Sequence, residues 1–397
     1  MYANGFFVSA PSEFFVFRRI IEGAPVEYGV SVLKTHLRQR STLMSNGIRY
    51  VGLDVHRDSI SIAVRDYRGK IVKETVIPTS ESALLGFLQE LPGTVHVALE
   101  EGTWAVWLYE LLQGRVRRVV VCDPRKNNRQ GNKNDRIDAR ELADLLRCDR
   151  LAPVFHGATG LRSLRELART YGVLTKEQTR TMNRIKALYR SYAIACAGQA
   201  CYGPKQRSTW LAKLPHSSIG ERAKVYYEQL DGLRQLRQKV RQQLLAEGKK
   251  QSAYGKLKSI PQMGPVGTVL LIAFVQTPQR FRSKRQLWAY CGFALETHSS
   301  GDHRWVNGQQ ERSKKAALIR GLNSNHHPVL KWIFKSAATR ACAKEGPLRD
   351  FYSSLLQQGA RAEMARLTVA RKIAAIALAL WKKGESFDAQ KLKSQAA

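Results

Sequence analysis

Residues 48–77 read IRYVGLDVHRDSISIAVRDYRGKIVKETVI, and this stretch decides the fold of the surrounding part of the chain. Apolar side chains alternate with small or polar ones through 59–64, which is typical of a strand with one buried face. The apolar-rich runs 48–54 and 71–77 lie on either side of it, and the second run follows a turn at 66–69. The pattern predicts a three-stranded meander.

Helical and strand patterns alternate after the meander. We expect helices at 82–91 and 104–112, strands at 95–99 and 116–121, and a closing helix that begins near Asp135 and ends near Leu146. Three hairpin-connected strands followed by alternating helix and strand indicate a mixed α/β sheet. This domain is predicted to span residues 48–155, and residues 1–47 form an N-terminal extension without a sustained period.

The rest of the chain is predicted to be helical. Apolar residues recur at roughly heptad spacing from Leu161 to Leu188 and again from Tyr226 to Leu244, with a break that contains Gly and Pro between them. Residues 156–250 therefore form a long helical or coiled-coil middle segment, and an ordinary helical bundle is an equal alternative. Residues 251–397 form a mainly α C-terminal domain that ends in an amphipathic helix over 367–383.

The composition points to a polyanionic partner. Lys and Arg number 65 against 32 Asp and Glu, which gives a net charge of +33. Because the basic residues extend from Arg18 to Lys393, they favour nucleic acid over a membrane surface, which would need one concentrated basic helix or tail. Six scattered cysteines without zinc-like spacing, and no run of about 18 apolar residues, predict an intracellular, cytoplasmic protein that does not bind membranes.

Four carboxylates are candidate metal ligands. Asp54 and Glu100 each end a predicted strand, and in a mixed sheet such ends can lie side by side. Asp135 and Asp138 are three residues apart, so a helix presents both on one face. Oxygen-rich acidic sites suit Mg²⁺ or Mn²⁺, whereas each acid alone could equally pair with a nearby Arg. Glu101 is the alternative to Glu100.

The sequence gives weaker indications of function for the neighbours of Asp54 and for several basic residues. His56 and Asp58 are interpreted as loop residues. The turn at 260–267 resembles a helix-hairpin-helix, in which backbone N–H groups such as that of Gly264 can hold a phosphate, and a plain helix connection is an equal alternative. The candidate nucleic-acid-binding side chains, which a solvated basic face would also explain, are Arg125, Lys126, Arg129, Lys133, Arg136, Arg140 and Lys314.

These segments together match a known family. Residues 50–54, 97–103 and 132–140 resemble the DEDD motifs of the insertion sequence 110 family of transposases, which includes the Piv-type DNA invertases. The turn 259–265, the block 280–292 and the sequence His298-Ser299-Ser300-Gly301 are similar to later motifs of the same family in the same order. The chain departs from the family's motifs at two places. Gln262 replaces a usual Gly, and residues 312–316 lack the Gly of the family's Ser-Lys-Arg-Gly stretch.

The resemblance implies a fold and a mechanism. The N-terminal α/β domain would have the RNase H-like (RuvC-like) fold, and Asp54, Glu100, Asp135 and Asp138 would bind the metal. Ser300, with Ser299 as the second choice, would attack DNA and form a phosphoserine link in a C-terminal serine transposase domain. A bridge RNA would pair with donor and target DNA, and a homodimer or homotetramer would assemble on them.

Two rival functions stay open at this point. A RuvC-like metal-dependent endonuclease would hydrolyse DNA without a covalent intermediate, so its cleavage would survive Ser300→Ala. A non-catalytic protein that binds nucleic acid would show no metal-dependent strand breakage. The complete set of four acids favours an enzyme over the second rival.

Overall fold

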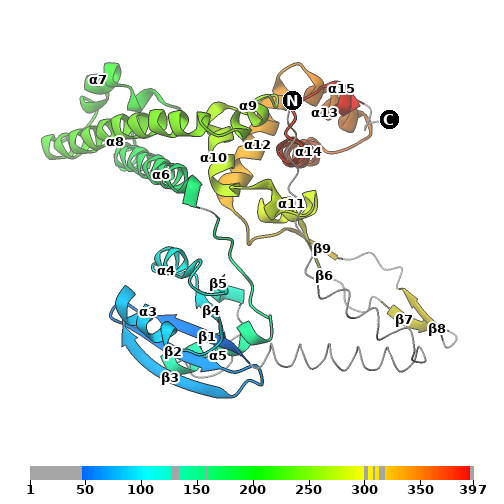
Figure 1. Cartoon of the computed structure of the whole chain (residues 1–397). Helices are drawn as coiled ribbons and strands as arrows, with labels where there is room; N and C mark the ends of the chain where they lie inside the picture. Colours follow the sequence, from blue (N-terminus) through cyan, green and yellow to red (C-terminus); the bar gives the residue numbers. More distant parts are fainter. Residues whose placement is uncertain are drawn as a thin grey trace, which may run out of the picture. The chain divides into compact units, whose positions relative to one another are not determined.

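The computed structural model describes residues 47–126, 134–157, 159–298, 303–306, 309–312 and 318–393. The chain divides into two compact units, Met1–His156 and Gly157–Ala397. The first unit is mixed α/β and the second is largely helical (Figure 1). Among the described residues, no helix combines the length and the apolar character that are needed to cross a membrane.

A five-stranded mixed sheet forms the centre of the first unit, in the order β3-β2-β1-β4-β5. β1 pairs antiparallel with β2 and parallel with β4, which in turn pairs parallel with β5. The predicted meander and the mixed α/β sheet are therefore confirmed. The strands are β1 (Ile48–Val55), β2 (Ser59–Arg65), β3 (Ile71–Pro78), β4 (Thr94–Glu100) and β5 (Arg118–Cys122).

Helices cover both faces of this sheet. α3 (Glu81–Gln89) and α4 (Ala105–Leu112) pack on the face that carries Val51 and Leu53 and form the main core of the unit. α5 (Asp135–Arg147) packs on the opposite face, where Leu146 meets β4 and β5. Because side chains alternate along a strand, the residues of β1 that face α5 are those at even positions, including Gly52.

α5 approaches β1 very closely at Gly52. A Cβ atom at this position would lie 2.1 Å from the carbonyl oxygen of Ala139 and 2.7 Å from the amide nitrogen of Ala143. No side chain fits in that space, so only glycine allows the helix backbone to lie directly on the strand. This contact fixes the start of α5 near the end of β1.

In the second unit, the two predicted long helices form an antiparallel hairpin. α6 (Arg162–Arg190) and α8 (Ser217–Lys249) pack along each other, with Thr181 Oγ1 donating to Gln229 Oε1 at 3.2 Å. Near the turn of the hairpin, Tyr189 donates to Tyr227 at 3.0 Å, and Tyr227 donates to the carbonyl of Cys201 at 2.8 Å. The predicted break between the helices contains the short α7 (Arg207–Leu211) and two 3-10 turns, Ala200–Tyr202 and Pro204–Gln206.

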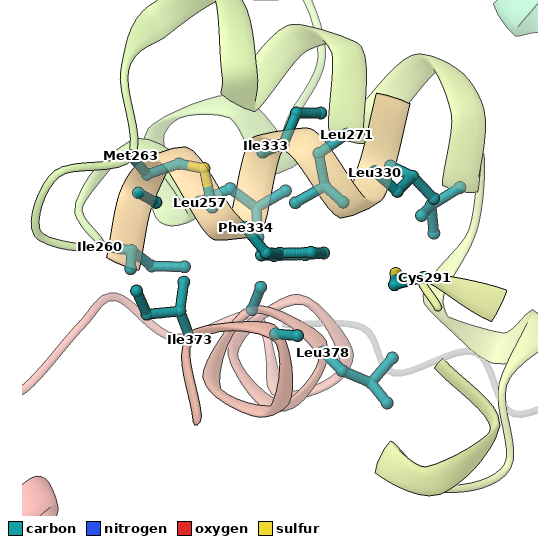
Figure 2. Close-up of a cluster of buried hydrophobic side chains, with 14 of the residues drawn as sticks. Leu257, Ile260, Met263, Leu271, Cys291, Leu330, Ile333, Phe334, Ile373 and Leu378 are labelled. Atoms are coloured by element: carbon teal, nitrogen blue, oxygen red, sulfur yellow. The ribbon is translucent and has the colours of Figure 1, made fainter. Parts of the chain in front are cut away.

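The remainder of the second unit is a helical core. Figure 2 shows Phe334 between its own helix and the helix that carries Ile373 and Leu378. The Phe334 ring and the aliphatic side chains around it are almost fully buried. The helices are α9 (Ala253–Lys258), α10 (Pro265–Val275), α11 (Lys284–Tyr290), α12 (Pro328–Ala343), α13 (Pro347–Gln357), α14 (Ala362–Lys383) and α15 (Gln390–Lys393).

Four short strands interrupt this helical core. β6 (Leu295–His298) pairs with β9 (Leu318–Leu322), and β7 (His303–Val306) pairs with β8 (Gln309–Arg312). The sequence pattern does not predict these strands. Each has only four or five residues, and most of their side chains are polar, so no period of two stands out.

The turn before α10 contains an unusual backbone. Gln262 has a φ of +64°, in the left-handed region, and its carbonyl accepts a hydrogen bond from Arg340 Nη2 at 3.0 Å. Gly is the residue expected here from the motif that the turn resembles, and Gln262 adopts the left-handed backbone that glycine favours. A side chain in this conformation costs about 1–2 kcal/mol.

We predict that Gly52→Ala lowers the stability of the first unit by at least about 1–3 kcal/mol, because α5 must move away from β1. Calorimetry of the full chain would measure the change. Gly86→Ala is the matched control, since Gly86 lies in α3 with nothing within 4 Å of an added Cβ. This control should be neutral or stabilise by about 0.5–1 kcal/mol. Equal effects of the two substitutions would contradict the argument.

We predict that Gln262→Gly stabilises the second unit by about 0.5–1 kcal/mol, the relief of the left-handed strain minus the entropy that glycine loses on folding. Gln262→Val should destabilise it, since β-branched residues tolerate positive φ poorly. Urea denaturation midpoints of the three proteins check the order Gly, Gln, Val. A Gly variant less stable than the parent would refute it.

Candidate metal and catalytic site

Asp54 and Glu100 occupy equivalent positions at the ends of two parallel strands. In the register of β1 and β4, Leu53 is opposite Leu99, and each acid is the next residue of its strand. Both therefore lie on the face that carries Gly52 and α5. They also line one cavity of about 160 Å³ together with the loop 101–104. The structure thus places the two strand-end acids next to each other.

The first turn of α5 supplies Asp135 and Asp138. Asn134 caps this helix, since its side chain accepts a hydrogen bond from the amide of Arg136 at 3.1 Å. The two aspartates are on the same side of the helix as the buried residues Ala139 and Leu142, which face the sheet. The close contact at Gly52 therefore brings the acidic turn to the end of β1.

His56 lies between two of these acids. Its Nε2 atom is 3.1 Å from Asp54 Oδ2 and 3.5 Å from Asp135 Oδ1. One ligand atom from each of Asp54, His56 and Asp135 lies within 4.8 Å of the others, so the three could hold a metal ion. His56 was expected to be a loop residue. The signal in the sequence that points to its role is the Asp-x-His spacing, since residues two apart share a strand face.

The electrostatics of this group indicate concentrated negative charge. Burial raises the pKa of Asp54 above its usual value, the hydrogen bond from His56 opposes this, and the charges of Asp138 and Asp135 raise the pKa further. The hydrogen bond to Asp54 raises the pKa of His56. Because the acids repel one another, a cation at their centre would stabilise all of them. The donor set of oxygens and one imidazole nitrogen fits a divalent metal.

Glu101 is directed elsewhere. Its Oε2 atom is 2.7 Å from Nε2 of His156, whose side chain is only 5% exposed. It follows Glu100 and so belongs to the opposite face of the strand. This contact accounts for Glu101 and supports Glu100 as the acid beside Asp54.

The candidate basic residues have different surroundings. Arg125 forms a two-point ion pair with Asp123, and Arg140 pairs with Glu74 of β3. Lys126 and Arg136 are exposed. Gly264 is the N-cap of α10, and no side chain caps that end. The candidates Arg129, Lys133 and Lys314 lie outside the described residues, as do Ser299 and Ser300, which follow β6 in the chain.

Two family models match two separate parts of the chain. The DEDD model of the IS110 type, described as "Transposase", matches residues 51–194, which include β1, β4 and α5 with all four acids. The model described as "Transposase IS116/IS110/IS902 family" matches residues 254–353, which include the turn before α10 and Ser300. The two matches follow the order of the motifs in the sequence.

Three relatives support the same assignment. The transposase for insertion sequence element IS1533 of Leptospira borgpetersenii is 33% identical over 109 residues, 26% of this chain and 32% of that relative. The transposase for IS1111A of Coxiella burnetii is 23% identical over 312 residues, 75% of this chain and 82% of the relative. The uncharacterized 44.8 kDa protein of insertion element IS116 of Streptomyces clavuligerus is 23% identical over 384 residues, 81% of this chain and 92% of the relative. The chain belongs to the IS110 family of transposases.

Proposed function

We propose that the chain is a site-specific DNA recombinase of an insertion sequence, in which an acidic metal site and Ser300 act on the same phosphodiester. Residues 48–155 would be an RNase H-like (RuvC-like) domain, 156–250 a helical linker and 251–397 a serine transposase domain. The observation that carries the proposal is the meeting of Asp54, His56 and Asp135 where β1 ends and α5 begins.

Mg²⁺ or Mn²⁺ is the proposed cofactor. Asp54, Glu100, Asp135 and Asp138 would hold it, and His56 would either add a nitrogen ligand or orient the two aspartates that it contacts. When bound, such a metal orients a phosphodiester and neutralises charge that develops in an in-line displacement. Only 17% of the Asp54 side chain is exposed, against 48% for His56 and 59% for Asp135, so Asp54 would fix the position of the other two.

Ser300 is the proposed nucleophile. Its Oγ would form a bond to phosphorus while the bond from phosphorus to a deoxyribose oxygen breaks, and the departing oxygen would take a proton as the hydroxyl loses one. A serine hydroxyl is a weak nucleophile at neutral pH and needs a base or a metal to activate it. His298, Asp302 and His303 are its nearest titratable neighbours in the sequence.

The proposed partners are donor and target DNA and a structured bridge RNA. A net charge of +33 supports binding of more than one nucleic-acid strand, because each phosphate contact releases counterions and adds affinity. Exchange between two DNAs calls for a homodimer or a homotetramer. The proposed location is the bacterial cytoplasm, in association with the nucleoid.

We predict that Mn²⁺ or Mg²⁺ stabilises the first unit and so raises its melting temperature. At a metal concentration about one hundred times the dissociation constant, the free energy of unfolding should rise by about 2.7 kcal/mol. Asp54→Asn and Asp135→Asn should abolish this shift, and His56→Ala should reduce it. Thermal melts with and without EDTA measure the effect. Asp144→Asn is the control, since Asp144 is also on α5 but pairs with Arg147 at 2.8 Å. An equal shift in all variants would exclude this site.

We predict a covalent DNA adduct in the wild-type protein, captured by denaturing it after incubation with its native flanking DNA and the RNA transcribed from it. The adduct should vanish in Ser300→Ala and in Asp54→Asn, because one removes the attacking oxygen and the other the metal site. Ser299→Ala is the matched control and should keep the adduct. Metal-dependent cleavage without any adduct would instead support the endonuclease alternative.

A further inference from the structure

A second cavity lies in the helical unit, separate from the acidic group. It has a volume of about 540 Å³ and is lined by α11, α13, α14 and the segment that follows α14. This volume falls within the range of about 300–1,000 Å³ typical of small-ligand sites. Its walls include Lys284, Trp288, Phe351 and Lys372.

Two alanines of α14 and a turn of the chain after that helix create the cavity. Ala375 and Ala379 line it from α14, and their short side chains leave space that larger ones would fill. Gly384 ends the helix with a φ of +72°, which turns the chain back along α14. Leu392 lines the cavity, is 6% exposed and joins the main core, so the returning segment is anchored at the cavity wall. The opening is therefore a feature of the packing.

The walls combine aromatic rings with positive charge. The indole Nε1 of Trp288 donates to the carbonyl of Arg371 at 2.9 Å, which holds the ring in place. Lys284 Nζ lies 5.7 Å from the centre of that ring, and Lys372 Nζ lies 5.6 Å from the centre of the Phe351 ring. The lining includes five cationic side chains and two acidic ones, and one acid, Glu385, pairs with Lys391 at 3.1 Å.

The charge of Lys284 acts on Lys372, the second lysine of the walls. Burial lowers the pKa of Lys372, and the charge of Lys284 lowers it further. Like charges brought together in a partly buried site are stabilised by an anion between them. Rings that are held rigidly beside such cations suit a ligand with a flat, polarisable part and an anionic part.

We propose that this cavity binds one unpaired nucleotide of a single-stranded nucleic acid, with its base against Trp288 and Phe351 and its phosphate between Lys284 and Lys372. The choice of nucleic acid as partner rests on the proposed function. A base has a planar face for stacking and a phosphate has the required charge, whereas an acidic peptide supplies only the charge. Stacking tolerates any base, so the site selects for unpaired structure rather than for sequence.

The test is ultraviolet crosslinking of the full chain to short single-stranded DNA and RNA oligonucleotides, followed by mass spectrometry of the crosslinked peptides. We expect a crosslink in the peptide that contains Trp288 or Phe351, and little with a fully paired duplex. Lys284→Gln with Lys372→Gln, or Ala379→Trp, should reduce this crosslink about tenfold. Ala379 is exposed within the cavity, so a large side chain there fills the space without entering the core.

Lys335→Gln is the matched control, because Lys335 is an exposed lysine of α12 that does not line the cavity, and its crosslinks should be unchanged. Comparison of the crosslinking of the DNA and the RNA oligonucleotides shows which of the two nucleic acids the cavity binds. Unchanged crosslinking in both cavity variants, or equal competition by polyglutamate, would overturn the proposal. If the protein forms no covalent DNA adduct but still crosslinks at the cavity, only the proposed function is contradicted. If the adduct forms but the cavity does not crosslink, only the nucleotide site is contradicted.

Discussion

The contact between α5 and β1 at Gly52 is the constraint on which the candidate metal site depends. Two of the four acids belong to a strand and two to a helix that begins 81 residues after Asp54, so nothing in the local sequence brings them together. The backbone of Ala139 takes the space that a side chain at residue 52 would need. The helix can then place its first turn at the strand end, where His56 contacts acids from both elements.

The chain combines a strong excess of basic residues with a local group of acidic side chains around Asp54. A charge of +33 attracts phosphates over a long range, but the carboxylates around Asp54 repel a phosphodiester at short range. A divalent cation changes the sign of that local interaction. Ion pairs such as Arg140 with Glu74 use part of the basic surface to hold β3 against α5, which secures the scaffold of the site.

The sequence predicts the sheet of the first unit well because its strands carry a clear alternation, and the strand-end acids follow from it. The choice between Glu100 and Glu101 depends on His156, which lies 55 residues later and gives no signal in the local pattern. His56 was missed because a residue just after a buried strand resembles a loop residue unless its partner Asp135 is known to be near. The strands β6 to β9 were missed because short polar strands carry almost no periodicity.

Small residues allow close packing in the first unit and leave open space in the second. At Gly52 the missing side chain is replaced by the backbone of a neighbouring helix, so the space is filled and the elements are fixed. At Ala375 and Ala379 the space beside the short side chains stays open as a cavity, which the segment beyond Gly384 also lines, and Leu392 of that segment is buried in the main core. The aromatic walls of that cavity stay in contact with water at a cost in free energy. A ligand that stacks on them would recover this cost, which is the physical reason to expect an occupant there.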